Sequence, residues 1–318
     1  MYKGKRIAVV VPAYCEERLI GVTLETMPDF VDRVIVVDDA SPDATAERVE
    51  AYRAEAADGE RVELVVHEEN QGVGGAIASG YVRARDEGYD VAVVMAGDAQ
   101  MDPADLPALL DPVVEGRADY AKGNRLFTGD AWKVIPRVRY LGNSMLSLLT
   151  KIASGYWQVA DSQCGYTALG SKALATLDWS ATYRRFGQPN DLLVRLNLYN
   201  FRVVDVPVKP IYGIGEKSGI KPFRMIPRLA LLLLRLFFFR MWNKYVIRDF
   251  HPLIFFYTLG IGLFLPGLGL GLYLVAHRIW LGPVATTSAL FAVFLFVTGL
   301  QSILFAMWFD MENVRRDR

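Results

Sequence analysis

The first 125 residues alternate between short runs of β-branched residues and longer stretches with apolar residues at helical spacing. The short runs predict strands at residues 7–11, 33–37, 62–66 and 91–95, with a weaker fifth strand at 119–122. The stretches between them predict helices at residues 17–27, 44–57, 73–87 and 103–115. Strands that alternate with helices predict an α/β fold, with a parallel sheet and helices on both of its faces.

Two long apolar runs dominate the C-terminal end of the chain. Residues 252–276 and 279–309 contain no formally charged side chain. About 20 apolar residues in a helix span the hydrocarbon core of a bilayer, so each run is long enough to do so. Only His277 and Arg278 separate the runs. We therefore expect a hairpin of two transmembrane helices with a short turn on the far side. A pair of long buried helices in a soluble protein is the alternative.

Cationic residues flank the predicted hairpin unevenly. Lys244 and Arg248 precede the first run and three of the last four residues are arginine, whereas the predicted turn contains only Arg278. Membrane proteins retain cationic flanks on the cytoplasmic side. The pattern predicts that both ends of the hairpin, and the whole preceding domain, lie on the cytoplasmic side of the inner membrane.

Two further stretches are amphipathic. In residues 221–247, Arg224, Arg228 and Arg235 are spaced four and seven apart, which places them on one face of a helix over an apolar underside. Such a helix suits the headgroup level of a membrane. Residues 138–152 carry apolar side chains every three or four positions. This second helix fits either a membrane surface or packing on the soluble core.

Charge and cysteine content support this division of the chain. The sequence has equal numbers of basic and acidic residues, 35 each, but residues 221–318 contain 11 Lys and Arg against 4 Asp and Glu. An acidic first part and a basic, apolar last part predict a soluble domain tied to a membrane, and argue against a nucleic-acid partner. Cys15 and Cys164 form no metal-binding spacing. We expect two free thiols, with a disulfide as the alternative. The expected domains are residues 1–220, 221–250 and 251–318.

Polar residues follow each predicted strand, at the edge of the sheet where ligands bind in such folds. The segments are residues 12–17, 38–43, 70–76, 97–103 and 122–125. Each has a plain structural alternative: Asp38 and Asp39 could serve only a turn, and residues 70–75 could be only a glycine loop before a helix. Asp98 and Gln100 offer hard oxygen ligands of the kind that Mg²⁺ or Mn²⁺ prefers, whereas Asp102 before Pro103 is expected to cap a helix.

Taken together and in this order, the segments resemble the family 2 glycosyltransferases. The resemblance covers about residues 5–215 and includes an Asp-Ser-Gln-Cys-Gly-Tyr segment at 161–166. It implies a GT-A, Rossmann-like domain that binds a nucleotide-sugar. With a membrane hairpin behind that domain, the chain looks most like the polyprenyl-phosphate glycosyltransferases, the dolichyl-phosphate mannose synthase and bactoprenol glucosyltransferase type.

The sequence departs from that family pattern at two places. The metal motif of the family usually reads Asp-x-Asp-x-Gln, and its first aspartate falls here on Ala96. A later segment of the mannose synthases has an arginine that residues 212–218 lack, so Lys217 or Lys209 would supply the cation. The first departure bears on metal affinity and on the choice of donor, and leaves the expected fold unchanged.

The resemblance implies a role for particular residues. It assigns donor binding to Pro12, Ala13, Tyr14, Glu16, Asp38, Asp39, Gly72 and Asp98, and a divalent ion, Mg²⁺ or Mn²⁺, to Asp98 and Gln100. It assigns the acceptor phosphate to Arg125, Arg139, Asn143 and Lys217, and catalysis to Asp98, Arg125 and Asp161. Asp161 and Asp191 are the candidates for a general base if one is required. None of the three histidines, His67, His251 and His277, is expected to act as one.

The expected reaction is therefore the transfer of one hexose, with inversion, from a UDP- or GDP-sugar to dolichyl or undecaprenyl phosphate at a bilayer surface. A phosphate acceptor needs no general base, because a phosphomonoester with a second pKa of about 6 is already mostly ionised at neutral pH. Two alternatives remain: the same fold acting on another lipid or glycan acceptor, and a non-catalytic membrane scaffold that binds sugar nucleotides. The sequence leaves a homo-oligomer open.

Overall fold

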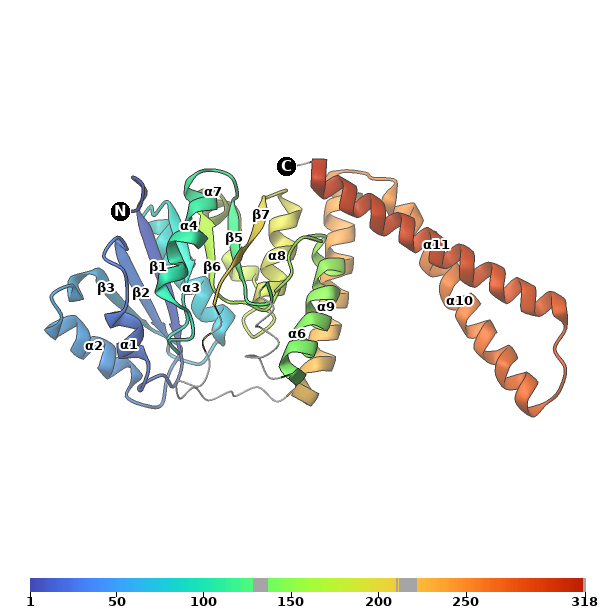
Figure 1. Cartoon of the computed structure of the whole chain (residues 1–318), viewed down its shortest axis with the longest axis horizontal. Helices are drawn as coiled ribbons and strands as arrows, with labels where there is room; N and C mark the ends of the chain where they lie inside the picture. The colour runs from blue at the N-terminus through green and yellow to red at the C-terminus, as the bar shows by residue number, and fades with distance from the viewer. Residues whose placement is uncertain (128–136, 210, 212–221, 317–318) are drawn as a thin grey trace. The chain divides into compact units, whose positions relative to one another are not determined.

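The chain forms two compact units, Met1–Phe237 and Phe238–Arg318. The computed structural model describes residues 1–127, 137–209, 211 and 222–316 (Figure 1). The first unit contains the sheet and most of the helices, and the second contains the two long apolar helices.

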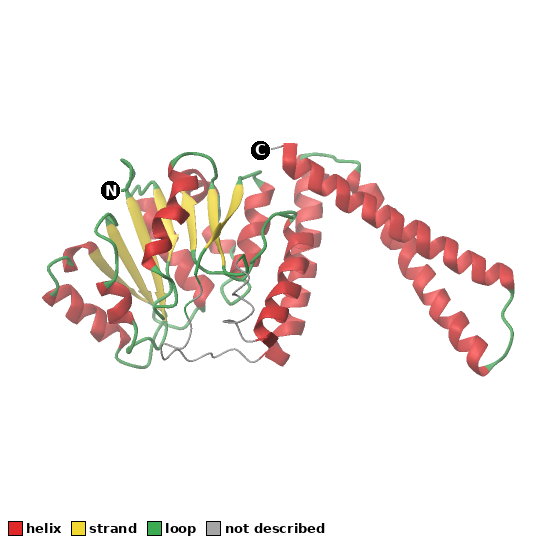
Figure 2. Ribbon diagram, in the orientation of Figure 1, coloured by secondary structure: helices red, strands yellow, loops and turns green. Residues whose placement is uncertain are grey.

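A mixed sheet organises the first unit (Figure 2). Within the described residues its strands are β1 (Ile7–Ala13), β2 (Arg33–Asp38), β3 (Val62–Val66), β4 (Val91–Val94), β5 (Tyr120–Asn124), β6 (Thr167–Gly170) and β7 (Val203–Pro207). Their order across the sheet is β3-β2-β1-β4-β6-β5-β7. The five predicted strands are present, with ends that shift by no more than two residues.

The sheet is parallel only in part. Strands β1 to β4 run parallel to their neighbours, as predicted, and β5 runs parallel to β7. Strand β6, which lies beyond the residues from which the parallel sheet was predicted, is antiparallel to both β4 and β5, so the complete sheet is mixed. After β5 the described chain continues with helix α6 (Arg137–Ser154), and a loop then leads into β6.

Strand β1 is buried on both of its sides because helices cover both faces of the sheet. Its odd-numbered residues belong to one core with α1 (Ile20–Glu25), α2 (Thr45–Glu55) and α4 (Leu106–Val114). The other face meets α3 (Val73–Asp86), where a Cβ added to Gly80 would lie 2.2 Å from Val10 Cγ1. Alternate residues of a strand point to opposite faces, so α3 lies across the sheet from the other three helices.

Helix α6 turns its polar side toward the protein. Ser147 and Thr150 are no more than 2% exposed, whereas Leu141 and Met145 are 60% and 61% exposed. Thr150 Oγ1 donates to Asn190 Oδ1 at 2.9 Å, on helix α8 (Gln188–Leu198). Ordinary packing of the apolar side of this helix onto the soluble core was the alternative in the sequence analysis, and it is wrong. The apolar side is available for another partner.

Helix α9 (Pro222–Trp242) covers most of the amphipathic stretch predicted at residues 221–247 and also exposes apolar side chains. Leu229 and Leu233 are buried, whereas Leu231 and Leu234 are about half exposed. Arg228 and Arg235 are exposed as well. A π-helix, Asn243–Arg248, continues from its end. The exposed face of α9 thus combines arginines with leucines, the composition expected at a lipid surface.

The second unit is built on two long helices, α10 (Leu253–Trp280) and α11 (Thr286–Arg316). Both contain a stretch that is long and apolar enough to cross a membrane. The chain turns at residues 281–285, where Gly282 has a φ of +119° and Pro283 follows. The prediction that His277 and Arg278 separate the helices was therefore wrong, because both lie in the last turns of α10.

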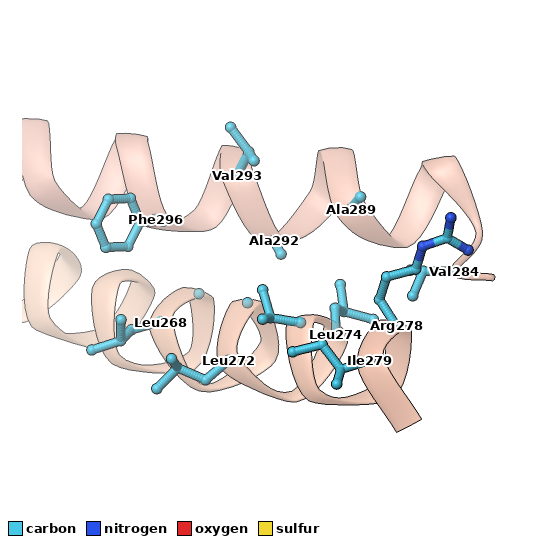
Figure 3. A pocket seen from close by; sticks show the side chains of 13 residues that line it. Leu268, Leu272, Leu274, Arg278, Ile279, Val284, Ala289, Ala292, Val293 and Phe296 are labelled. Atoms are coloured by element: carbon cyan, nitrogen blue, oxygen red, sulfur yellow. The ribbon is translucent and has the colours of Figure 1, made fainter. Parts of the chain in front are cut away.

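Glycines set how closely α10 and α11 pack. A Cβ added to Gly267 would lie 2.5 Å from Phe296 N, and one added to Gly299 would lie 2.4 Å from Phe264 N. Close backbone approach at small residues is typical of helices in membranes. Toward the turn the helices separate and leave an apolar groove of about 530 Å³, with Arg278 at one end (Figure 3). Close packing is thus confined to the part of the hairpin away from the turn.

A buried ion pair joins the end of α9 to α11 within the second unit. Arg240 Nη1 and Nη2 lie 2.7 and 2.9 Å from Asp310 Oδ1 and Oδ2, and both side chains are completely buried. The hydroxyl of Tyr245 donates to Asp310 Oδ1 at 2.6 Å. The bidentate geometry and the third hydrogen bond offset the cost of removing both charges from water.

Replacing Arg240 by Met should lower the stability of the protein in detergent, because it leaves the Asp310 carboxylate buried without its cation. The expected loss in the free energy of unfolding is about 3–5 kcal/mol. The double variant Arg240→Met, Asp310→Leu should recover most of that loss, since no unpaired charge remains. The unfolding midpoint is measured by thermal denaturation for the wild type, Arg240→Met and the double variant. Arg235→Met, at an exposed position of the same helix, is the control. A wild-type unfolding midpoint for Arg240→Met would contradict this account.

Candidate active site

The loops after β1 and β2 hold each other in place at the carboxyl edge of the sheet. Cys15 N donates to Ser41 Oγ at 3.0 Å, and Glu16 N donates to Thr45 Oγ1 at 2.9 Å. The Asp38 carboxylate is buried and accepts both the backbone N–H and the hydroxyl of Ser41. Asp38 therefore shapes the turn that supports residues 12–16.

Asp39 organises the neighbouring loop. Its side chain is buried, and Oδ1 accepts from Gln71 N at 2.8 Å while Oδ2 accepts from Gly72 N at 2.7 Å. Gly72 has a φ of +88°, and an added Cβ would lie 2.6 Å from Arg184 O. Only glycine fits this position without strain. The structure thus brings Asp39 and Gly72, two predicted donor-binding residues, into direct contact.

A histidine that the sequence analysis set aside completes this cluster. His67 Nδ1 lies 2.7 Å from Asp39 Oδ1, and His67 Nε2 lies 2.9 Å from Ser79 Oγ. The imidazole is buried beside the carboxylate. His67 therefore supports Asp39. Its place directly after β3 was the signal that could have identified it.

Two acidic groups share the part of the edge formed by β1 and β4. Burial and then the nearby Asp98 carboxylate raise the pKa of Glu16 to about 7, with a smaller contribution from Asp43. An added Cβ on Gly97 would lie 3.6 Å from Glu16 Cγ, so the loop after β4 passes close to this side chain. Asp98 Oδ1 accepts from Gln100 N at 3.1 Å. The arrangement gathers negative charge and fits a bound cation.

The sequence predicts only two metal ligands, Asp98 and Gln100. Within residues 1–127, 137–209, 211 and 222–316, no three His, Cys, Asp or Glu side chains converge in the way that a protein-only metal site requires. Ala96, at the position of the missing aspartate, donates its backbone N–H to Met101 Sδ at 3.3 Å. Asp102 caps the 3₁₀ turn Pro103–Asp105 by accepting from Ala104 N, as expected. Any metal here would need further ligands from a substrate or from water.

Arg125 and Asp161 form a bidentate pair at the end of β5. Arg125 Nε lies 2.8 Å from Asp161 Oδ2 and Nη2 lies 3.2 Å from Oδ1, and Asp161 is completely buried. Asp161 Oδ1 also accepts from Gln163 N at 3.1 Å. Burial acts to raise the pKa of Asp161, but the Arg125 guanidinium outweighs it and the pKa lies below its usual value. The guanidinium is thereby fixed in orientation, with about a quarter of its side chain exposed.

The remaining predicted residues lie on α8, near the end of β1, or outside the described part of the chain. Asp191, in the first turn of α8, is buried and accepts from Tyr183 N and Arg195 Nε. Tyr14 is exposed, whereas Pro12 and Ala13 are buried at the end of β1. The side chains of Arg139 and Asn143, on α6, and the whole of Lys217 lie outside the described residues.

The sequence and the fold were compared with known proteins. The model of the glycosyl transferase family 2 matches residues 8–177. A UDP-N-acetylglucosamine–dolichyl-phosphate N-acetylglucosaminyltransferase of Methanococcus voltae is 30% identical over 71% of this chain and 97% of its own. An undecaprenyl-phosphate mannosyltransferase of Micrococcus luteus is 31% identical over 64% of this chain and 82% of its own.

Solved structures give the fold. A crystal structure of glucosyl-3-phosphoglycerate synthase from Mycobacterium tuberculosis, in complex with Mn²⁺, uridine diphosphate and glucosyl-3-phosphoglycerate, superposes with a TM-score of 0.53. The two proteins are 21% identical, and the match covers 74% of this chain and 80% of the other. The expected GT-A α/β fold is confirmed, together with two apolar C-terminal helices as a candidate membrane hairpin.

Replacing Asp98 by Asn should lower the pKa of Glu16. The substitution removes the neighbouring like charge, but burial remains, so the pKa should fall below about 7 and stay above its ordinary value. A carbon-13 NMR titration of protein labelled at glutamate measures the shift. Asp102→Asn is the matched control, because Asp102 does not contribute to the pKa of Glu16. Equal Glu16 pKa values in the two variants would contradict the proximity of Glu16 and Asp98.

Proposed function

Because the chain belongs to the glycosyl transferase family 2, we propose that it transfers one hexose, with inversion, from a UDP- or GDP-sugar to polyprenyl phosphate. One observation carries the choice of acceptor. Two relatives of about 30% identity are named as transferases that use dolichyl or undecaprenyl phosphate. This chain also has the pair of membrane-length apolar helices that suits so lipophilic a substrate.

The donor would bind at the carboxyl edge of β1, β2 and β4. Residues 12–16 and the loop around Gly72 would cradle the nucleoside, and Asp38 and Asp39 would hold those segments in shape, since their own oxygens accept hydrogen bonds from the protein. Burial raises the pKa of Glu16 most, and the nearby Asp98 and Asp43 carboxylates raise it further, so negative charge gathers at this edge. That charge supports a cation bound with the diphosphate.

Asp98 and Gln100 would hold that cation, Mg²⁺ or Mn²⁺, together with oxygens of the donor. The neighbouring Glu16 and the small number of converging protein ligands both fit a metal that arrives with its substrate. When bound, the ion would neutralise charge on the departing nucleoside diphosphate. The relative that binds Mn²⁺ and uridine diphosphate has the same fold, which supports the donor class without fixing the nucleobase.

The acceptor phosphate would meet Arg125. The Asp161 carboxylate holds the guanidinium in one orientation, so little freedom remains to be lost when phosphate binds. One phosphate oxygen would form a bond to the anomeric carbon as the bond from that carbon to the nucleoside diphosphate breaks. The acceptor is already ionised and Asp161 is paired with Arg125, so the step needs no proton transfer to Asp161.

The membrane would hold the protein through several elements. We place the two helices of the hairpin across the bilayer and the exposed apolar faces of α6 and α9 at its surface, with residues 1–220 on the cytoplasmic side. The lipid phosphate would then lie at the headgroup level. Proximity would supply much of the rate, because both substrates would be held in place before reaction.

A non-catalytic scaffold is the second candidate, and Ala96 is the observation that favours it. A protein of that kind would bind the donor and gain thermal stability from it, but would transfer no sugar. An assay of purified protein with polyprenyl phosphate and a panel of UDP- and GDP-sugars separates the two functions.

Asp98→Ala and Arg125→Ala should each abolish turnover in that assay, measured at a temperature where circular dichroism shows the variant folded, because Arg125→Ala leaves the buried Asp161 carboxylate unpaired and costs stability. The first removes the proposed metal ligand and the second removes the proposed phosphate partner. Losses on the order of 100-fold or more are expected where a positioned charge is removed from a transition state. Asp102→Ser is the matched control, because serine retains the helix cap two residues beyond the metal motif. Wild-type turnover in either alanine variant would remove that residue from the site.

Removing divalent ions should stop the reaction reversibly. Treatment with a chelator is expected to reduce turnover to background, and added Mn²⁺ or Mg²⁺ should restore it, because the proposed site relies on a cation shared with the donor. Circular dichroism before and after chelation is the control for folding. Full activity in the presence of excess chelator would show that this chain works without a metal.

A further inference from the structure

A second carboxylate lies beside the Arg125–Asp161 pair. Asp205, on β7, accepts through Oδ2 from Ala160 N at 2.6 Å and from Asn124 Nδ2 at 3.1 Å. Asn124 directly precedes Arg125 and Ala160 directly precedes Asp161. A single oxygen therefore ties together the two chain segments that carry the ion pair.

The neighbours of Asp205 give it an unusual environment. On β5 its register partner is Lys122, a fully buried residue that donates to Cys164 O. Among the described residues Asp205 forms no ion pair, and its Oδ1 is shielded from solvent without a hydrogen-bond partner. A carboxylate kept in such a place costs stability. A buried carboxylate that costs stability suggests a role other than holding the fold together.

We propose that Asp205 is a positioning residue of the transfer reaction, and that its carboxylate fixes the Arg125–Asp161 pair relative to strand β7. The inference rests on the function proposed above. The ion pair joins Arg125, directly after β5, to Asp161, in the loop before β6. Neither residue lies in a strand, so sheet hydrogen bonds do not hold the pair in place. Without Asp205, the pair could shift as a unit while its own contacts stayed intact. A displacement of about 1 Å at a reacting centre can cost about 100-fold in rate.

Protonation offers a way to test this role. Burial raises the pKa of Asp205 to about 6; the Ala160 N–H, Lys122 on β5 and Lys151 on α6 act to lower it, and Asp161 acts to raise it. As the pH falls through about 6, Asp205 gains a proton and Oδ2 becomes a weaker acceptor, so turnover should fall. Stability should change in the opposite direction. A raised pKa means that the folded state binds the proton more tightly, so the contribution to stability is complete below about pH 4 and is lost as the pH rises through about 6.

The experiment compares Asp205→Asn and Asp205→Ala with Asp119→Asn and Asp119→Ala. Asp119 is the matched control, because its carboxylate accepts from Arg202 N at 2.8 Å at the opposite ends of β5 and β7. At pH 7.5 the Asp205 variants should lose about 10- to 100-fold in kcat, the worth of hydrogen bonds to a charged acceptor, with the larger loss for Ala. The unfolding midpoint of Asp205→Asn should equal or exceed that of the wild type. The Asp119 variants should retain wild-type kcat.

The pH profile separates Asp205 from the acceptor phosphate, which also titrates near pH 6. The wild type should lose kcat with two overlapping steps on the acid side, and Asp205→Asn should lose one of them. Hydrogen exchange of the Ala160 amide gives a measurement that needs no turnover: exchange should accelerate in Asp205→Ala and stay unchanged in Asp119→Ala.

The outcomes distinguish this inference from the proposed function. If the wild type transfers no sugar to polyprenyl phosphate from any donor, the proposed function fails. In that case unchanged Ala160 exchange in Asp205→Ala would overturn the positioning role, and faster exchange would retain it. If the wild type is active, wild-type kcat in Asp205→Ala overturns the inference. Equal kcat losses in the Asp119 and Asp205 variants, in proportion to lost stability, overturn it as well.

Discussion

Acidic side chains gathered at one edge of a sheet must each be hydrogen-bonded, paired or protonated, and this constraint sorts the site. Asp39 is satisfied by the backbone amides of Gln71 and Gly72, and therefore shapes a loop. Asp161 is satisfied by Arg125 and remains ionised. Glu16, beside Asp98, has its pKa raised to about 7. The proposed division of the edge into supporting residues, a phosphate site and a cation site follows from these three solutions.

The sequence predicted what depends on local pattern. β-branched runs gave β1 to β4, and the polar segments after them gave the candidate donor edge, because strand ends in such sheets converge. The antiparallel position of β6 could not be predicted, because it is set by tertiary pairing with β4 and β5 and not by local pattern. Asp205 was missed for a related reason: it lies within a strand, and its importance comes from contacts with Asn124 and Ala160, about 45 to 81 residues away along the chain.

The apolar surface of the first unit could be only partly predicted. Helical spacing identified the apolar stripe of α6, but the usual inference that such a stripe faces a core was wrong. The buried face is the one with Ser147 and Thr150, which find partners in Ser162 and Asn190. Exposed leucines on α6 and α9 cost free energy in water. Contact with lipid would remove that cost, so the catalytic unit has its own reason to lie at a membrane, independent of the hairpin.

A reaction whose nucleophile is already ionised leaves little for a general base to do, and this shifts the demand from proton transfer to geometry. Asp161, with a lowered pKa, is a poor base but a good anchor for a guanidinium. An anchor is useful only if it is itself held in place. A buried carboxylate that bridges the residues before Arg125 and Asp161 meets that need, and its cost in stability is tolerable where the alternative is a phosphate site that can drift.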